Sequence, residues 1–296
     1  MKTQAKTLVS FTQGLKFTES PRWHGGKLWF LDIHGKAIKT VDLDGQVSTV
    51  LDLPFIPNGL GLTAEGNAVF GDALQRRVHR WDGTVLHQVA DIGDLTTFCL
   101  SDAIIDARGG LYIGDIGYNF FDRTIKPVET CVIVRVEPDG RATVVADKLF
   151  FPNGMAITPD GQTLIVGETI GHRLTAFDIR ENGSLGNRRV WAQLADDVMP
   201  DGICLDAHGA AWVANPVGKD KVIRVVEGGQ ITDRIDVAAE AYAVMLGGPA
   251  GKHLFICTSA SHDPAEIHKS PSATIEVVEV DVPGVNVGRV YENVAQ

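Results

Sequence analysis

Few cysteines, no long apolar run and no secretion signal characterise this chain of 296 residues. No apolar run approaches the roughly 18 residues that a membrane-spanning helix needs, so we expect no membrane association. The opening residues, MKTQAKT, lack the apolar core of a signal peptide. The cysteines form no CxxC pair and lie in or beside apolar runs, as reduced, buried cysteines do: Cys99, Cys131, Cys204 and Cys257. These features predict a cytoplasmic protein.

Positive charge is also scarce. The chain has 27 Lys and Arg against 37 Asp and Glu, a net charge of −10, and no basic run interleaved with aromatic residues. Nucleic acid needs a positive surface, so we expect no nucleic-acid partner. The chain contains no G-x-S-x-G, H-E-x-x-H, P-loop or dinucleotide-binding pattern. Serine-hydrolase, zincin, kinase and Rossmann functions therefore lack support, and nothing indicates the oligomeric state.

What the chain does contain is a repeated phrase. Residues 152–161 (PNGMAITPDG) and 200–209 (PDGICLDAHG) both place an oxygen-bearing side chain before a Gly, continue as an apolar strand and turn at a Gly. A second apolar strand follows each phrase, which indicates a β-hairpin. Weaker copies raise the total to six, at a mean spacing of about 45 residues, the size of a propeller blade. We therefore predict an all-β, six-bladed β-propeller forming a single domain over residues 1–296.

Two segments outside the repeats have predicted places. Thr7–Leu15 is expected to join the last blade near Ile275–Val280, because closing the ring removes an exposed sheet edge. Tyr118–Thr130 is the longest insertion between repeats. Such a loop is expected to lie over one face of the ring and to border a pocket.

The leading residue of each repeat is predicted to lie at one mouth of the central channel, which the innermost strands line. These positions are Glu19, Asn58, Ser101, Asn153, Asp201 and Ala243. Carboxylate, amide and hydroxyl oxygens without His or Cys suit a hard cation such as Ca²⁺, Mg²⁺ or Mn²⁺, and Zn²⁺ also binds carboxylates. The alternative is that Asn and Asp before Gly simply form turns.

With these phrases the chain resembles the regucalcin/gluconolactonase-like family (senescence marker protein/gluconolactonase/luciferin-regenerating enzyme), six-bladed propellers related to diisopropylfluorophosphatase. The resemblance covers nearly the whole chain and is carried by residues 19–23 (ESPRW), 151–156 (FPNGMA) and 200–202 (PDG). It implies one divalent metal ion, Ca²⁺ first, with Zn²⁺, Mn²⁺ or Mg²⁺ as alternatives, held by Glu19, Asn153 and Asp201. It also implies hydrolysis of a small-molecule lactone or related ester.

Five further positions are expected to contact the substrate: Asn58, Ser101, Asp102, Phe151 and His172. His172 follows the hairpin of the 152–161 phrase and is either a proton carrier at the pocket rim or a turn residue. The neighbouring Ser261-His262-Asp263 is not expected to form a catalytic triad, because triad members come from separated segments.

The chain also departs from the family pattern. The family usually has Asn-Asp-Gly at residues 101–103, where this chain has Ser-Asp-Ala, and its sugar-lactone members carry an Arg at the position of Cys99. Both losses count against a gluconolactone-like substrate. Apolar side chains precede several ring positions and either face the pocket or pack between blades: Phe55, Phe98, Phe151 and Met199.

The expected mechanism is Lewis-acid catalysis. The metal ion would polarise the lactone carbonyl, on which negative charge develops as water attacks. Asp201 is the candidate general base, and direct attack by Asp201 is the competing route. Two other functions stay open: a phosphotriesterase-like hydrolase, and a non-catalytic propeller that binds metal or a small molecule, which the change at Ser101 favours.

Overall fold

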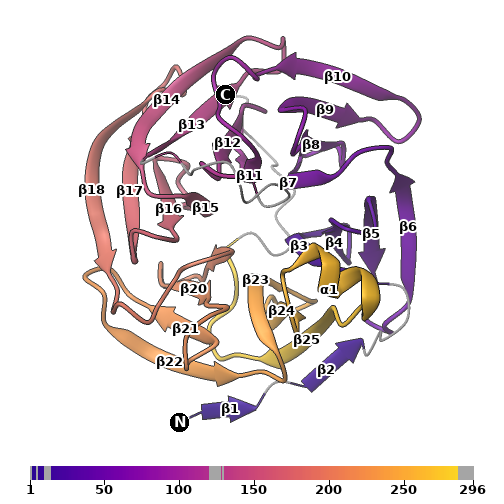
Figure 1. Cartoon of the computed structure of the whole chain (residues 1–296). Helices are drawn as coiled ribbons and strands as arrows, with labels where there is room; N and C mark the ends of the chain where they lie inside the picture. The colour runs from indigo at the N-terminus through magenta and orange to yellow at the C-terminus, as the bar shows by residue number, and fades with distance from the viewer. Residues whose placement is uncertain (1, 5, 10–14, 120–127, 129, 286–296) are drawn as a thin grey trace.

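The computed structural model describes residues 2–4, 6–9, 15–119, 128 and 130–285. Six β-sheets stand around a central channel, as Figure 1 shows, and each has four or five strands. The predicted all-β, six-bladed propeller is therefore confirmed. Over the residues just given, no helix is long and apolar enough to cross a membrane, and α1 (Pro264–Lys269) is a single short helix that lies within the outline of the ring in Figure 1.

Apart from two N-terminal strands, the strands of each sheet follow one another along the chain, with the innermost strand first. The first three blades are β3 (Thr18–His24), β4 (Lys27–Asp32), β5 (Ala37–Val41) and β6 (Val47–Asp52); β7 (Pro57–Leu62), β8 (Ala68–Asp72), β9 (Arg77–Trp81) and β10 (Leu86–Asp91); and β11 (Leu100–Ile105), β12 (Leu111–Asp115), β13 (Cys131–Val136) and β14 (Ala142–Leu149). The last three are β15 (Pro152–Ile157), β16 (Thr163–Glu168), β17 (Arg173–Ile179) and β18 (Leu185–Gln193); β19 (Ile203–Leu205), β20 (Ala211–Ala214), β21 (Val222–Val225) and β22 (Ile231–Asp236); and β23 (Glu240–Gly247), β24 (His253–Ser259) and β25 (Thr274–Glu279).

The N-terminal strands complete the last two blades. β2 (Lys6–Val9) pairs antiparallel with β25, and β1 (Lys2–Gln4) pairs parallel with β22. The predicted pairing of the N-terminal segment with the last blade is therefore present over Lys6–Val9, and residues 10–14 lie outside the described part of the chain. Tyr118 and Asn119 begin the predicted long loop, of which residues 120–127 and 129 also lie outside it.

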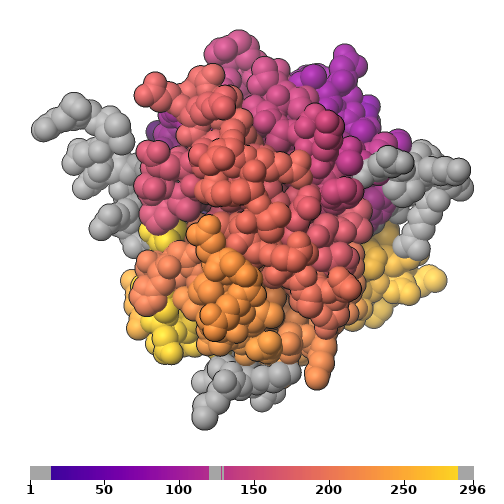
Figure 2. All heavy atoms as spheres, turned by 90° about the vertical axis from the view of Figure 1, so that its left-hand side faces the viewer, coloured from indigo at the N-terminus to yellow at the C-terminus, as the bar shows by residue number. Residues whose placement is uncertain are grey.

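The core lies between neighbouring blades. Every residue of β8, β12 and β20 is buried, because both faces of these strands meet an adjacent sheet. One cluster joins Ile165 of blade four to Val213 of blade five, and Figure 2 shows these blades, in salmon and orange, packed against each other in a side view. Burial on both faces explains why the middle strands appear in the sequence as continuous apolar runs. All four cysteines are buried and free, as predicted.

A register shift interrupts most inner strands at the predicted ring position. The shifts fall at residues 19–22, 58–60, 100–103, 152–155 and 241–243. Such a β-bulge bends the strand and redirects a side chain. In the last blade the bulge places Tyr242 at the cavity, whereas Ala243, the predicted ring residue, is buried in the core between blades. The prediction was wrong by one position because the last hairpin is one residue longer: Tyr242 lies nine residues before the turn glycine Gly251, whereas Asn153 lies eight residues before Gly161.

Close approach of the inner strands explains the glycine after the ring residue. A Cβ on Gly154 would lie 2.3 Å from the backbone oxygen of Asp201, and one on Gly202 would lie 2.6 Å from the Cβ of Ala243. Residues 153–154 lie within β15, and Gly202 directly precedes β19. The Asn-Gly and Asp-Gly pairs are therefore required by strand packing at the axis rather than by turns.

Candidate active site

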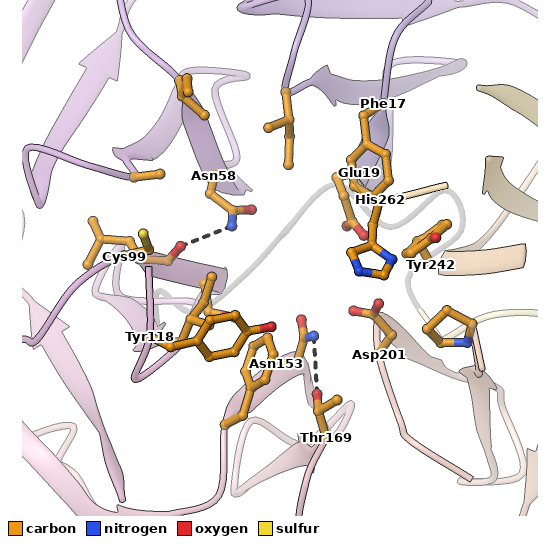
Figure 3. Close-up of a pocket in the computed structure, with 18 of the residues that line it drawn as sticks. Phe17, Glu19, Asn58, Cys99, Tyr118, Asn153, Thr169, Asp201, Tyr242 and His262 are labelled. Carbon is orange, nitrogen blue, oxygen red and sulfur yellow. Dashed lines mark hydrogen bonds between the residues drawn. The ribbon is translucent and has the colours of Figure 1, made fainter. Parts of the chain in front are cut away.

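A cavity of about 270 Å³ opens at one end of the central channel. Five of the six predicted ring positions line it, as does the predicted Phe151: Glu19, Asn58, Ser101, Asn153 and Asp201. Figure 3 shows four of them, Glu19, Asn58, Asn153 and Asp201, around the cavity. A larger cavity of about 550 Å³ lies at the opposite ends of the same inner strands and is lined by Arg22, Leu62 and Ile157, among others. The carboxylates converge in the first cavity, which makes it the candidate site.

Glu19 and Asp201 destabilise each other's charge. Each is only 9% exposed. Burial, followed by the negative charge of Asp102, raises the pKa of Glu19 from 4.5 to about 8, against the opposing effects of the Ser20 N–H and Arg22. Burial, followed by the charges of Glu19 and Asp102, raises the pKa of Asp201 well above its ordinary value. Without a cation the pair therefore retains a proton at neutral pH.

The amide of Asn153 has a fixed orientation. Its Nδ2 donates to Thr169 Oγ1 at 3.2 Å, and the Thr169 hydroxyl donates to the backbone oxygen of Pro200 at 2.8 Å. Because that hydroxyl proton is already used, Thr169 can only accept from Asn153. Figure 3 shows the result, with the Asn153 amide nitrogen facing Thr169 and its oxygen turned toward the cavity.

The amide of Asn58 is held by neighbouring backbone. Its Nδ2 donates to the oxygen of Leu100 at 3.0 Å, and its Oδ1 accepts the N–H of Gly59 at 3.0 Å. An amide oxygen has two lone pairs, so one acceptor position is left on Asn58 for a ligand.

Asp102 does not line the cavity. It accepts from Ser20 Oγ at 3.0 Å and from the Ala103 N–H at 2.8 Å, and it pairs with Arg22, whose Nη2 lies 3.1 Å away. These contacts join the inner strands of blades one and three. Asp102 therefore acts on the site through its charge, and its position gives no support to the predicted substrate contact.

His172 also lies away from the cavity lining. It occupies the turn between β16 and β17 with φ of +49°, as Lys36 and Arg76 occupy the equivalent turns of other blades with φ of +53° and +55°. Its Nδ1 is 2.9 Å from the oxygen of Val198. The geometry favours the turn alternative over the proton carrier.

Among the residues that line the cavity, sequence reasoning missed Tyr242 and His262. Tyr242 was missed because the last repeat has one more residue before its turn glycine, and His262 was considered only within an unconvincing triad. His262 borders the cavity, while Asp263 caps α1 by accepting the Ala265 N–H at 2.9 Å. Asp263 thus has a structural role, in agreement with the expectation that these neighbours form no triad.

The fit of a metal ion rests on oxygen chemistry. Within the described ranges, no group of three or more His, Cys, Asp and Glu side chains is placed to hold a metal ion. The cavity instead offers two buried carboxylates whose repulsion a cation would relieve, and an amide oxygen of Asn153 turned toward the cavity. Hard oxygen donors of this kind suit Ca²⁺, Mg²⁺ or Mn²⁺, so the residues fit a divalent cation without distinguishing one.

The aromatic and apolar residues before the ring positions divide into two groups. Phe151 and Met199 line the cavity. Phe55 stacks on Phe70 and His79, with ring centroids 6.3 and 4.7 Å away, and Phe98 packs against a buried cluster. Two of the four residues therefore face the pocket, and the other two pack within the protein between blades.

Comparison with known proteins gives a consistent picture. A profile described as the SMP-30/gluconolactonase/LRE-like region matches residues 17–260. A 6-deoxy-6-sulfogluconolactonase of Pseudomonas putida is 28% identical over 279 residues, which span 90% of this chain and 92% of that protein. The structure of a gluconolactonase from Xanthomonas campestris superposes with a TM-score of 0.74 at 25% identity, covering 94% and 89% of the two chains. That of regucalcin, a calcium-binding protein of Agrobacterium tumefaciens, gives 0.77 at 21% identity, covering 95% of each. The chain belongs to the SMP-30/gluconolactonase/LRE-like family.

Proposed function

We propose that this protein is a divalent-metal-dependent lactonase, which opens the ring of a lactone or related ester by adding water. The observation that carries the proposal is the convergence of two buried, mutually repelling carboxylates and one oriented amide oxygen in a single cavity. The names of the Pseudomonas and Xanthomonas relatives support lactone hydrolysis. The calcium-binding relative supports Ca²⁺ as the first ion to test, ahead of Zn²⁺, Mn²⁺ and Mg²⁺.

Glu19, Asn153 and Asp201 would hold the metal ion. When bound, the ion supplies a Lewis acid for the carbonyl oxygen of the substrate. Asn58 and Ser101 line the same cavity and contribute a free amide lone pair and a hydroxyl for orienting the lactone. These proposed roles are the ones that the sequence predicted for the same residues.

Asp201 is the proposed general base. It removes a proton from the water whose oxygen bonds to the carbonyl carbon, and the bond between that carbon and the ring oxygen then breaks. The departing ring oxygen takes up the proton, which leaves a hydroxy acid. The new carboxylic acid ionises at neutral pH, so each turnover releases one proton to solvent.

Proton release gives a direct assay. We expect Asp201→Asn to lower kcat/KM at least a hundredfold on the best lactone of a panel, the scale of a lost general base. Asp196→Asn, at an exposed position in the loop before Asp201, is the matched control and is expected to match wild type. Wild-type rates in Asp201→Asn would show that the catalytic assignment is wrong. Full activity after chelation would remove the metal from the proposal and leave lactone hydrolysis in place.

Beyond the change at Ser101, no observation on the described residues favours the phosphotriesterase-like or the non-catalytic alternative. Including a phosphotriester in the panel tests the first alternative. Titrating metal into the inactive variant tests the second, because it measures metal binding without catalysis.

A further inference from the structure

We infer that the substrate is a lactone bearing an apolar side group, rather than a polyhydroxylated or anionic sugar lactone. This inference rests on the proposed function and adds the substrate class. It follows from the walls of the cavity, which are mainly apolar, in contrast to the side lined by carboxylates.

One wall is an apolar cluster from blades three and four. Cys99, Ile116 and Phe151 are 2%, 5% and 8% exposed and pack together, yet all three line the cavity. Tyr118 lies edge-on to the Phe151 ring with centroids 5.8 Å apart. This wall offers a substrate carbon and aromatic surface.

The other wall comes from blades one, two and six. Phe17 contacts Tyr242 edge-on, with ring centroids 4.7 Å apart, and Ile33 and Ile56 line the cavity beside them. The Tyr242 hydroxyl donates to Glu240 Oε2 at 2.6 Å, so it is already engaged by protein. The second wall therefore adds mainly apolar surface as well.

Among the described residues that line the cavity, the Asp and Glu side chains have no Lys or Arg beside them. Burial, followed by the charge of His268, lowers the pKa of His34 to about 4, so this lining imidazole is neutral at neutral pH. An anionic substituent, such as the sulfo group in the name of the Pseudomonas relative, would meet no Lys or Arg on the described part of these walls.

Hydroxyl groups of a substrate would also gain few hydrogen bonds from these walls. A buried hydroxyl that loses water without gaining a partner weakens binding. The polar side chains that line the cavity lie on the same side as the carboxylates. Several of them already form hydrogen bonds within the protein, as Asn153 does with Thr169 and Asn58 does with the backbone oxygen of Leu100. A lactone ring can use this polar side while an alkyl or aryl substituent covers the walls. The volume of 270 Å³ equals about nine waters, enough for such a ring with a short substituent.

The test is a homologous series of γ-lactones whose alkyl side chain grows from methyl to pentyl, compared with glucono-δ-lactone, in the proton-release assay. Each added methylene is expected to raise kcat/KM about fourfold, equivalent to ~0.8 kcal/mol, until the cavity is filled. The best alkyl lactone is expected to exceed gluconolactone at least a hundredfold. A preference for gluconolactone, or a flat series, would overturn this inference while the proposed lactonase function stood. No hydrolysis of any lactone would overturn the proposed function itself.

Variants locate the specificity. Cys99→Arg places a cation in the apolar wall and is expected to lower kcat/KM for the longest alkyl lactone at least tenfold, with a smaller effect on the methyl lactone. Gln88→Arg, at an exposed position of β10, adds the same charge elsewhere and is the control. Because Cys99→Arg could impair folding, Phe151→Leu is a second variant, expected to flatten the chain-length series while retaining activity on the methyl lactone. An unchanged series in both variants would show that this wall does not contact the substrate.

Discussion

Replacing Glu19 with Gln tests whether the cavity holds repelling carboxylates. The folded-state pKa of Glu19 is about 8 against 4.5 for an ordinary glutamate. Between these values the folded protein retains a proton that the unfolded chain has lost, so this group makes stability fall as pH rises from 4.5 to 8. Gln carries no charge in either state and escapes the penalty. In chelator, the variant is therefore expected to be more stable than wild type by about 1 kcal/mol at pH 5 and about 3 kcal/mol at pH 7.

Thermal unfolding measures this difference. With about 2 cal/mol/K of unfolding entropy per residue, 3 kcal/mol corresponds to ~5 °C in Tm for a chain of this length. Glu266→Gln on the exposed face of α1 is the matched control and should shift Tm little. Saturating Ca²⁺ or Mn²⁺ should reverse the order, because only wild type gains binding free energy. The argument from buried charge would be refuted if the variant were no more stable than wild type at pH 7. It would also be refuted if the gain in stability at pH 5 were as large as the gain at pH 7.

Two further substitutions test single contacts. Thr169→Val removes the hydroxyl that orients Asn153 and is expected to weaken metal binding 10- to 100-fold by calorimetry, while Thr169→Ser restores it; equal affinities in the two variants would assign the orientation to another group. His172→Ala is expected to leave kcat/KM within twofold and its pH profile unchanged, since this side chain lies in a turn; a lost limb of the profile would restore its role as proton carrier.

The fold could be predicted because its sequence signal is periodic. Each blade repeats an oxygen-bearing residue, a glycine and an apolar strand, and the two closest copies, at Asn153 and Asp201, determine the spacing of the rest. Closure of the ring then required a strand from the N-terminus, which β2 supplies. Periodicity and edge protection are general properties, so they needed no knowledge of individual contacts.

The site was predictable only in part, for local reasons. Ring residues share one geometric environment, so Glu19, Asn58 and Ser101 could be placed from the repeat. Tyr242 could not, because the last hairpin has one residue more than the four repeats before it between the ring position and its turn glycine, Gly251. Thr169 could not either, because its role depends on a hydrogen bond to Pro200 from a different blade, which no spacing encodes.

Buried acceptors at the ends of the second strands explain why the cavity walls are firmly placed. Asp32 accepts the N–H groups of Lys16 and Phe17 at 3.0 and 3.1 Å, and Glu168 accepts that of Phe150 at 2.8 Å. Asn215, directly after β20, accepts the N–H of Met199 at 3.0 Å.

Each of these acceptors anchors the segment that enters an inner strand, where a buried N–H without a partner would be costly. The anchored segments carry three wall residues of the cavity, Phe17, Phe151 and Met199. The acceptors are thus buried carboxylates and an amide with a structural role, distinct from the pair at the channel mouth. Because the anchors fix the backbone, a change of wall side chain can alter substrate choice without moving the carboxylates. In the proposed lactonase, specificity and chemistry would therefore be carried by different residues of the same short segments.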